Sequence, residues 1–282
     1  MQIPAYTVTF TLRKIAGNNR IPVGEWGYSL YSWMTAHTSA GDFMHEGIKN
    51  GRRPVKPFVL CPPFGVLESG GMYHFGSNGF TIGLRTPAEY VASSTFEAFK
   101  EAMETGREIK IGKTFFLCTG VELKERMLPF ALCQKKESGR ETVLEVHPET
   151  PIALHLHSGR VKGKQLSPVN EQFRDSLIRS LKGRIEALAK FYHFECLNCK
   201  LEEAVLQVEL VDELFKVVSV DIHMRRKGKV VNVEGSKVPL KMITCSNCAK
   251  CISTVMHVLG VGGRIAFGFG TVKTKLIHTG RS

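Results

Sequence analysis

The stretch Gly260-Val-Gly-Gly-Arg264-Ile-Ala-Phe-Gly268-Phe-Gly270-Thr-Val272 lies between a helical pattern at 246–259 and a strand-like pattern at 264–277. Glycine adopts positive φ and lets a backbone approach a ligand closely, and successive N–H groups after a helix attract phosphate. The run is neither a P-loop nor a dinucleotide fingerprint, because it precedes a strand and lacks Gly-Lys-Ser/Thr. A tight helix-to-strand connection is the other interpretation of the same glycines.

Outward from this run, the second half alternates extended and helical patterns. A long amphipathic helix is predicted at 169–193, where Phe173, Leu177 and Leu181 follow helical spacing. Extended segments are predicted at 151–158, 204–211, 215–225 and 229–242.

The first half has the same order of patterns. A capping signal, Thr86-Pro87-Ala-Glu89, opens a helix that stops at Gly106. The other predicted elements are a strand at 3–14, a helix at 25–38 and extended segments at 56–67, 77–85 and 110–123.

This order, βαββαβ in each half, predicts an α+β fold of two tandem ferredoxin-like, RRM-like domains. The polar stretch 134–140 marks the boundary between them. We expect an N-terminal domain at 1–130 and a C-terminal domain at 140–282.

The composition indicates a polyanionic partner. The chain has 282 residues, with 38 Lys and Arg against 26 Asp and Glu, so its formal charge is +12. The positive charges form short clusters beside glycine turns instead of following one amphipathic helix, which favours nucleic acid over a membrane surface. No apolar stretch reaches ~18 residues, and the N-terminus alternates like a strand, so we expect a cytoplasmic protein.

Five cysteines have the spacing of metal ligands. Cys196 with Cys199, and Cys245 with Cys248, form two C-x-x-C pairs, and four thiolates would suit a structural zinc ion. An iron–sulfur cluster that uses Cys251 and small residues without metal are the alternatives. A reducing compartment argues against a disulfide framework.

Three segments together resemble the CRISPR-associated endoribonucleases that process precursor CRISPR RNA, members of the repeat-associated RAMP superfamily. The first is the run 260–272. The second is Phe43-Met44-His45-Glu46-Gly47 followed by Lys56-Pro57-Phe58, and the third is Thr150-Pro151-Ile152 with Leu166-Ser-Pro168. The resemblance covers nearly the whole chain. It implies that the protein cuts CRISPR repeat RNA within each repeat, releases guide RNAs and leaves a 2′,3′-cyclic phosphate and a 5′-hydroxyl.

Metal-independent RNA cleavage needs proton transfer and a positive charge beside the phosphorane. Histidine suits the first task and lysine or arginine the second. We assign acid–base work to His45 and charge stabilisation to Lys56, with Arg52 and Arg53 nearby. Some members of the family have a tyrosine in the third turn of the first helix, where this chain has Met34. Tyr31 and His37 are the alternatives for a third catalytic group.

The remaining predicted RNA contacts are phosphate-binding groups. The resemblance assigns the Arg225–Lys229 hairpin to the base of a repeat hairpin, and phosphate contacts position the RNA. The predicted contacts outside the catalytic segment are Arg160, Lys162, Lys164, Arg225, Arg226, Lys227, Lys229, Gly260, Gly262, Gly263, Arg264, Gly268 and Gly270.

The expected function is thus a CRISPR repeat endoribonuclease without a catalytic cofactor, with an effector complex as a further partner. Two rivals stand beside it. One is a repeat-RNA-binding subunit without activity, favoured by Met34. The other is a redox or sensing module built around the cysteines.

Overall fold

The structure is a computed structural model of the whole chain. It describes residues 1–49, 54–130, 141–154, 166, 168, 172–194, 201–211, 216–224, 229–263, 265 and 268–278. None of the described helices is both long enough and apolar enough to cross a membrane.

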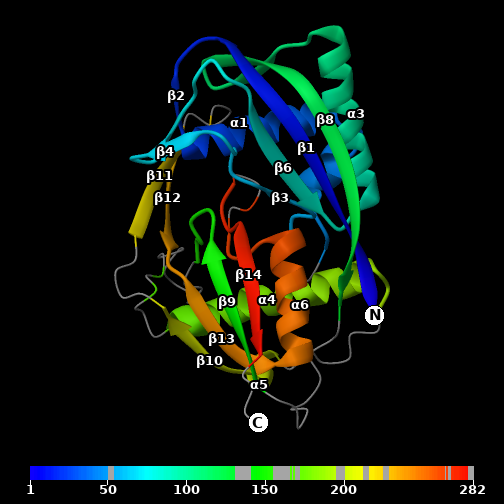
Figure 1. Cartoon of the computed structure of the whole chain (residues 1–282), viewed down its shortest axis with the longest axis vertical. Helices are drawn as coiled ribbons and strands as arrows, with labels where there is room; N and C mark the ends of the chain where they lie inside the picture. Colours follow the sequence, from blue (N-terminus) through cyan, green and yellow to red (C-terminus); the bar gives the residue numbers. More distant parts are fainter. Residues whose placement is uncertain are drawn as a thin grey trace.

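The first half is built around a five-stranded antiparallel sheet in the order β3-β6-β1-β8-β7 (Figure 1). Its strands are β1 (Gln2–Ala16), β3 (Val59–Leu60), β6 (Phe80–Thr86), β7 (Ile109–Ile111) and β8 (Thr114–Pro129). The helices are α1 (Val23–His37), α2 (Gly41–Glu46) and α3 (Glu89–Thr105). A small sheet lies beside them, made of β2 (Arg20–Pro22), β4 (Leu67–Ser69) and β5 (Met72–His74).

Local signals explain the limits of α3. Thr86 Oγ1 accepts a hydrogen bond from the Ala88 amide at 3.0 Å and donates to the Pro57 carbonyl at 2.5 Å. Gly106 ends the helix in the left-handed conformation with φ of 64°. The predicted stop of this helix is confirmed, whereas its start differs: the helix begins at Glu89 after the N-cap Ala88, so Pro87 lies before the first turn.

The second half has a four-stranded sheet in the order β10-β13-β9-β14. Its elements are β9 (Glu141–Pro148), α4 (Gln172–Phe191), α5 (Leu201–Ala204), β10 (Val205–Leu210), β13 (Leu240–Cys245), α6 (Ser246–Leu259) and β14 (Val272–His278). In both halves the first strand lies between the third and the fourth, and the second lies outside the third. The α+β fold with two ferredoxin-like units is confirmed.

The first strand of the second unit is not where the sequence placed it. The strand β9 covers 141–148 and alternates buried Thr142, Leu144 and Val146 with glutamates, so it reads as a polar segment. The predicted strand at 151–158 is wrong over its described part, because Ile152 and Ala153 make only isolated bridges, to Ser236 and Gly263.

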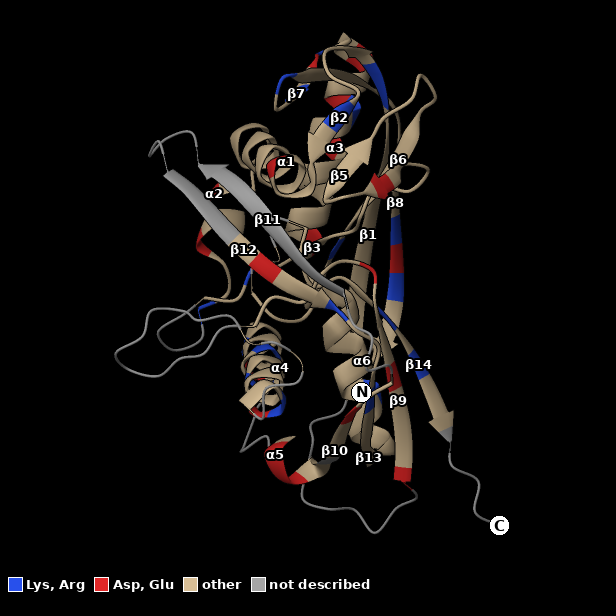
Figure 2. Ribbon diagram, turned by 90° about the vertical axis from the view of Figure 1, so that its left-hand side faces the viewer, with Lys and Arg blue, Asp and Glu red and all other residues tan. Residues whose placement is uncertain are grey.

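Two further boundaries differ for identifiable reasons. The predicted strand 229–242 is divided into β12 (Lys229–Lys237) and β13 at Pro239, which has no amide hydrogen to donate to a sheet. The strand β12 pairs with β11 (Lys216–Met224) in a separate hairpin that lies beside α1 (Figure 2). The last strand begins at Val272, because Gly268 and Gly270 have φ of 82° and 73°.

Each sheet has its own hydrophobic cluster, and polar contacts connect the two halves. Tyr192 donates from its hydroxyl to the carbonyls of Pro4 and Pro87 at 3.1 and 2.5 Å. Thr271 Oγ1 donates to the Leu60 carbonyl at 2.8 Å. The division into domains at 1–130 and 140–282 stays a prediction, since residues 131–140 lie outside the described part.

Candidate functional site

The short helix α2 presents His45 at the surface. Met44 is fully buried beneath it, whereas His45 on the next position is exposed. A Cβ on Gly41 would lie 2.1 Å from the Thr35 carbonyl, so only glycine permits this close start of the helix after α1. Gly47, with φ of 80°, ends it and donates its amide to the Phe43 carbonyl at 2.7 Å.

A closed loop brings Lys56 to the end of α2. The amide of Ile48 donates to the Val55 carbonyl at 2.7 Å, and the amide of Val55 donates to the Ile48 carbonyl at 2.9 Å. These two bonds fix Lys56 beside His45, although eleven positions separate them.

Tyr31 of α1 completes a cluster of three side chains. Its hydroxyl lies 3.0 Å from Nδ1 of His45. Lys56 Nζ donates to the same hydroxyl at 3.5 Å and lies 5.6 Å from the centre of the Tyr31 ring. We call Tyr31, His45 and Lys56 the trio.

Lys56 also binds the carbonyls at the end of α2. Its ammonium donates to Met44 O at 3.2 Å and to His45 O. A lysine has three N–H donors, so these two bonds and the long bond to Tyr31 occupy all of them. The 3.5 Å bond is the weakest by distance and the easiest to exchange for another acceptor.

Burial sets the protonation of Tyr31. Burial, with a smaller contribution from Tyr28, raises the pKa of Tyr31 to about 12, so its hydroxyl stays protonated at neutral pH. Burial also lowers the pKa of Lys56. A phenol hydroxyl can donate to a neutral imidazole or accept from an imidazolium. Tyr31 can therefore hold Nδ1 of His45 in either protonation state, which leaves Nε2 free for chemistry.

The structure separates the two alternatives for the third group. His37 is exposed, stacks on Trp33 with ring centres 4.6 Å apart, and has Nδ1 2.8 Å from the Trp33 carbonyl. Both of these contacts are with Trp33, on its own helix, and neither is with His45. Met34 is fully buried in the core, so its side chain cannot reach the cluster.

The glycine run is held by hydrogen bonds within the chain. Its amides at 260, 261, 263 and 270 donate to the carbonyls of Met256, Gly270, Ala153 and Pro151 at 2.7–3.0 Å. The Gly262 amide reaches Ser180 Oγ at 3.3 Å, and that of Gly268 donates to the Ile265 carbonyl at 3.0 Å. The amides of these six residues therefore do not form the phosphate-binding site expected from the sequence. Other contacts between the run and RNA stay a prediction.

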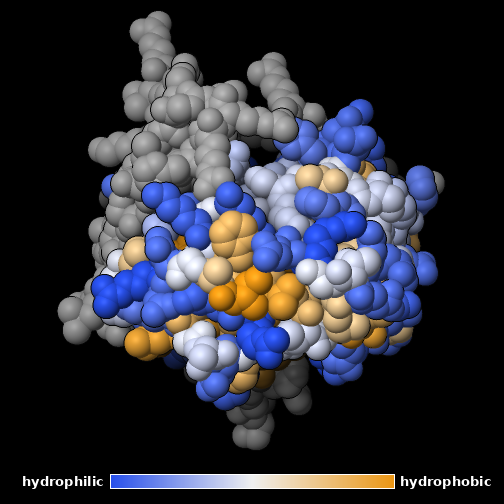
Figure 3. Space-filling model, turned by 90° about the horizontal axis from the view of Figure 1, so that it is seen from above, coloured by the Kyte–Doolittle hydropathy of each residue, from blue (hydrophilic) through white to orange (hydrophobic). Residues whose placement is uncertain are grey.

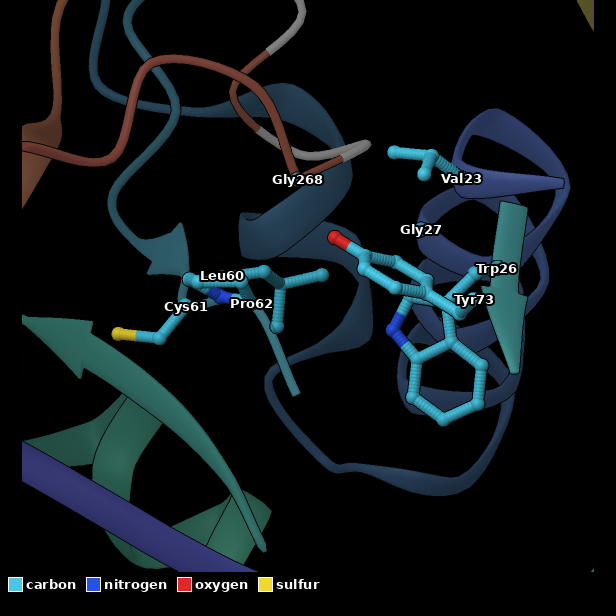
Figure 4. Close-up of a pocket in the computed structure, with 8 residues that line it drawn as sticks. All are labelled: Val23, Trp26, Gly27, Leu60, Cys61, Pro62, Tyr73 and Gly268. Atoms are coloured by element: carbon cyan, nitrogen blue, oxygen red, sulfur yellow. The ribbon is translucent and has the colours of Figure 1, made fainter. Parts of the chain in front are cut away.

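Two features tie the run to its surroundings. Gly268 lines a pocket with Trp26, Tyr73 and Cys61 (Figure 4). The guanidinium of Arg184, on α4, donates to the carbonyls of Leu259 and Gly262 and to the Ser180 side chain. Burial lowers the pKa of Arg184 to about 10. Sequence reasoning missed this arginine, because it is one of several basic residues along α4.

No known family model matches the chain, and no curated protein sequence matches it. Solved structures do match along its length. A RAMP protein that binds different RNA substrates is 18% identical, with a TM-score of 0.62, over 96% of this chain and 99% of the other. The product of a Cas6-related gene from Pyrococcus furiosus is also 18% identical, with a TM-score of 0.63, over 96% and 98%.

The chain has the Cas6 fold. A third structure, a Cas6 product complex, agrees with a TM-score of 0.61 at 14% identity over 96% of this chain and 99% of that one. Identities this low show the fold alone.

Many predicted RNA contacts lie outside the described residues: Arg52, Arg53, Arg160, Lys162, Lys164, Arg225, Arg226, Lys227 and Arg264. Lys229 is the first residue of β12, in a part of the strand whose side chains are not described. Their role in RNA binding stays a prediction.

The zinc site predicted from the cysteine spacing is not supported. Cys196 and Cys199 lie outside the described residues, and the described part holds no group of three or more metal-binding side chains. Cys245 is a free thiol, whereas Cys248 is disulfide-bonded. A sulfur in a disulfide is not a thiolate ligand, so the four-cysteine zinc site is not the arrangement found.

Proposed function

We propose that the chain is an endoribonuclease that cuts CRISPR repeat RNA within each repeat. The observation that carries this proposal is the trio, assembled from α1, α2 and the segment before β3, on a Cas6 fold. The neighbour in the product complex is itself named Cas6.

The chemistry follows from the groups present. The 2′-oxygen of the RNA attacks phosphorus, the P–O5′ bond breaks, and the products are a 2′,3′-cyclic phosphate and a 5′-hydroxyl. His45 as imidazolium gives its Nε2 proton to the leaving 5′-oxygen, while solvent takes the proton of the 2′-hydroxyl. Tyr31 orients the ring through Nδ1. A positioned general acid typically contributes ~10²–10⁴ in rate.

Lys56 supplies positive charge beside the phosphorane. Its ammonium is held against the end of α2 by two carbonyls, which fixes its position before RNA arrives. A phosphate oxygen would replace the long bond to Tyr31, because a charged acceptor makes a stronger hydrogen bond than a neutral hydroxyl. No step in this scheme requires a metal ion.

The test compares wild type with two histidine variants on repeat RNA transcripts in EDTA. Wild type should cut once per repeat and leave a cyclic phosphate. His45→Ala should cut ~10²–10⁴ more slowly and bind RNA within a few-fold of wild type. His37→Ala is the matched control, since it removes an exposed histidine outside the trio and should retain activity.

Two outcomes would overturn the proposal. Full activity of His45→Ala would remove His45 from the chemistry. If the wild-type protein binds repeat RNA tightly without cutting it, the result would instead favour an inactive RNA-binding subunit. Its role would then lie in an effector complex.

A further inference from the structure

The first sheet has one covered and one open face. Val8, Phe10 and Leu12 of β1 are fully buried on the side of the helices, where Phe10 stacks on Phe99 of α3 at 3.8 Å. The alternate residues are Thr7, Thr9 and Thr11, and these are partly exposed. Because side chains alternate along a strand, the threonines belong to the opposite, open face.

Among the described residues, the hydrogen bond and the ion pair that join the second half to this sheet lie at one end of the open face. At that end Thr254 of α6 donates to the Pro129 carbonyl at 2.6 Å, and Arg85 lies 3.8 Å from Glu149. The other end, where β1 finishes and β8 begins, extends away from the second half (Figure 1).

An aromatic ring is exposed at the edge of the open face. The backbone of Phe64 exchanges two hydrogen bonds with Thr81, at 2.7 and 3.1 Å. Directly paired residues share a face, and the neighbours of Thr81 on β6, Phe80 and Ile82, are buried on the covered side. Phe64 therefore lies on the open face, where 82% of its surface is exposed.

The surface next to Phe64 is flat. Thr81 pairs with Thr11 of β1, and Thr11 pairs with Gly120 of β8, so the row from Phe64 contains only small side chains. This row spans three strand spacings, roughly 14 Å. Small residues leave room for planar groups to lie against the sheet.

The far end of the open face is aromatic and basic. Phe116 is buried in the core, so its neighbour Phe115 lies on the open side, with Lys110 Nζ 5.2 Å from its ring centre. Arg13 is exposed on the same face, opposite Leu117. Within the described part of the chain, neither Arg13 nor Lys110 is paired with a carboxylate. Figure 3 shows apolar side chains enclosed by hydrophilic ones at this end of the molecule.

We propose that this open face binds single-stranded RNA, with nucleobases stacked on Phe64 and Phe115 and phosphates beside Arg13 and Lys110. The inference rests on the proposed function and adds a surface to it. The exposed ring of Phe64, the partly exposed ring of Phe115, the flat row between them and the nearby cations are together the properties of a stacking platform for single strands. The charges favour an RNA strand over an apolar protein segment as the occupant.

The trio lies on the helical side of the first sheet, across the edge strand β3 from the platform. Lys56 and Phe64 flank the edge strand β3. Because they are eight residues apart, their Cα atoms are at most roughly 28 Å apart, the length of a fully extended chain. A strand of RNA that crosses this edge can lie against Phe64 and reach His45. The platform would then bind nucleotides next to the cleaved bond.

The test places a reporter in the platform. Phe64→Trp keeps an aromatic ring and adds an exposed indole, whereas the native Trp26 and Trp33 are 4% and 7% exposed. We expect single-stranded 10-mer oligouridylate to quench the fluorescence of this variant, and duplex RNA of equal length to leave it unchanged, because paired bases are not available for stacking.

Affinity measurements on the same oligonucleotide separate stacking from apolar contact. Phe64→Leu keeps the apolar volume and loses the ring, so it should bind about 5- to 100-fold more weakly, while Phe64→Trp should bind as wild type does. Leu67→Ala is the matched control, since Leu67 is exposed by 66% and lies three residues away.

Absence of quenching, or equal binding by Phe64→Leu and wild type, would overturn the platform. Neither readout depends on cleavage. An enzyme that cuts repeat RNA without quenching refutes only this inference, whereas quenching without cleavage refutes only the proposed function.

Discussion

Two glycines of the 260–272 run differ in what a methyl group would meet, which makes Gly268→Ala and Gly270→Ala a matched pair. Both have positive φ, 82° at Gly268 and 73° at Gly270. A Cβ on Gly268 meets nothing within 4 Å, whereas one on Gly270 would lie 1.9 Å from the Val261 carbonyl oxygen and 2.7 Å from Ile265 Cδ1.

The expected losses of stability follow from these distances. Gly268→Ala carries only the backbone cost of a left-handed alanine, about 1–2 kcal/mol. Gly270→Ala adds an overlap that costs about 1–3 kcal/mol. It also displaces the Val261 amide bond to Gly270 and the Gly270 amide bond to Pro151, 3.0 and 2.9 Å long, each contributing about 1 kcal/mol. The total for Gly270→Ala is about 4–7 kcal/mol.

Thermal unfolding followed by calorimetry would measure the difference. At about 2–4 °C per kcal/mol, Gly268→Ala should lower Tm by about 2–8 °C, and Gly270→Ala should lower it by at least about 6 °C more. RNA affinity measured where both variants are folded provides the control for an effect on binding alone. Equal losses of Tm would refute the internal hydrogen bonding described for the run.

Two other predictions concern the trio and the contact between the halves. Tyr31→Phe removes the hydroxyl that holds Nδ1 of His45, so the rate of cleavage should fall by about tenfold or more while RNA affinity stays unchanged. Single-turnover kinetics over a range of pH would measure the rate. A wild-type rate would show that the hydroxyl has no role. Burial, with Arg85 and Arg126, lowers the pKa of His257 to about 4 from 6.5 in the unfolded chain, so the unfolded state binds the proton more tightly. The free energy of unfolding should therefore fall as pH decreases from 6.5 towards 4. In urea unfolding, His257→Gln should lose this part of the pH dependence. Identical pH dependence of the variant and wild type would contradict a buried, neutral His257.

The sequence determined those elements whose limits depend on neighbouring residues. The helix predicted at 246–259 is α6 at those limits, and Thr86 and Gly106 define the region of α3 as expected. Caps, prolines and helical spacing act over a few residues, so they can be read without knowing the fold. The repeated order of elements then sufficed for the fold class.

The position of β9 could not be read in this way. Its buried residues are interrupted by Glu141, Glu145 and His147, so the segment resembles a polar connection. It is a strand because β13 and β14 pair with it on both sides. Strand β13 lies about 100 residues and β14 about 130 residues further along the chain, and nothing local indicates either partner.

The candidate site also depends partly on local sequence and partly on contacts between distant segments. The sequence identified His45 and Lys56 as a pair of suitable groups, but left Tyr31 and His37 as equal alternatives. The rotation of α1 against α2 decided which of them meets His45, and the bonds between Ile48 and Val55 decided where Lys56 lies. Likewise, the glycine run was readable as a turn, while the acceptors of its amides, Pro151 and Ala153, come from another segment. Neighbouring residues in the sequence indicate which side chains of an element are buried. Its contact partners depend on distant segments, which only the folded chain brings together.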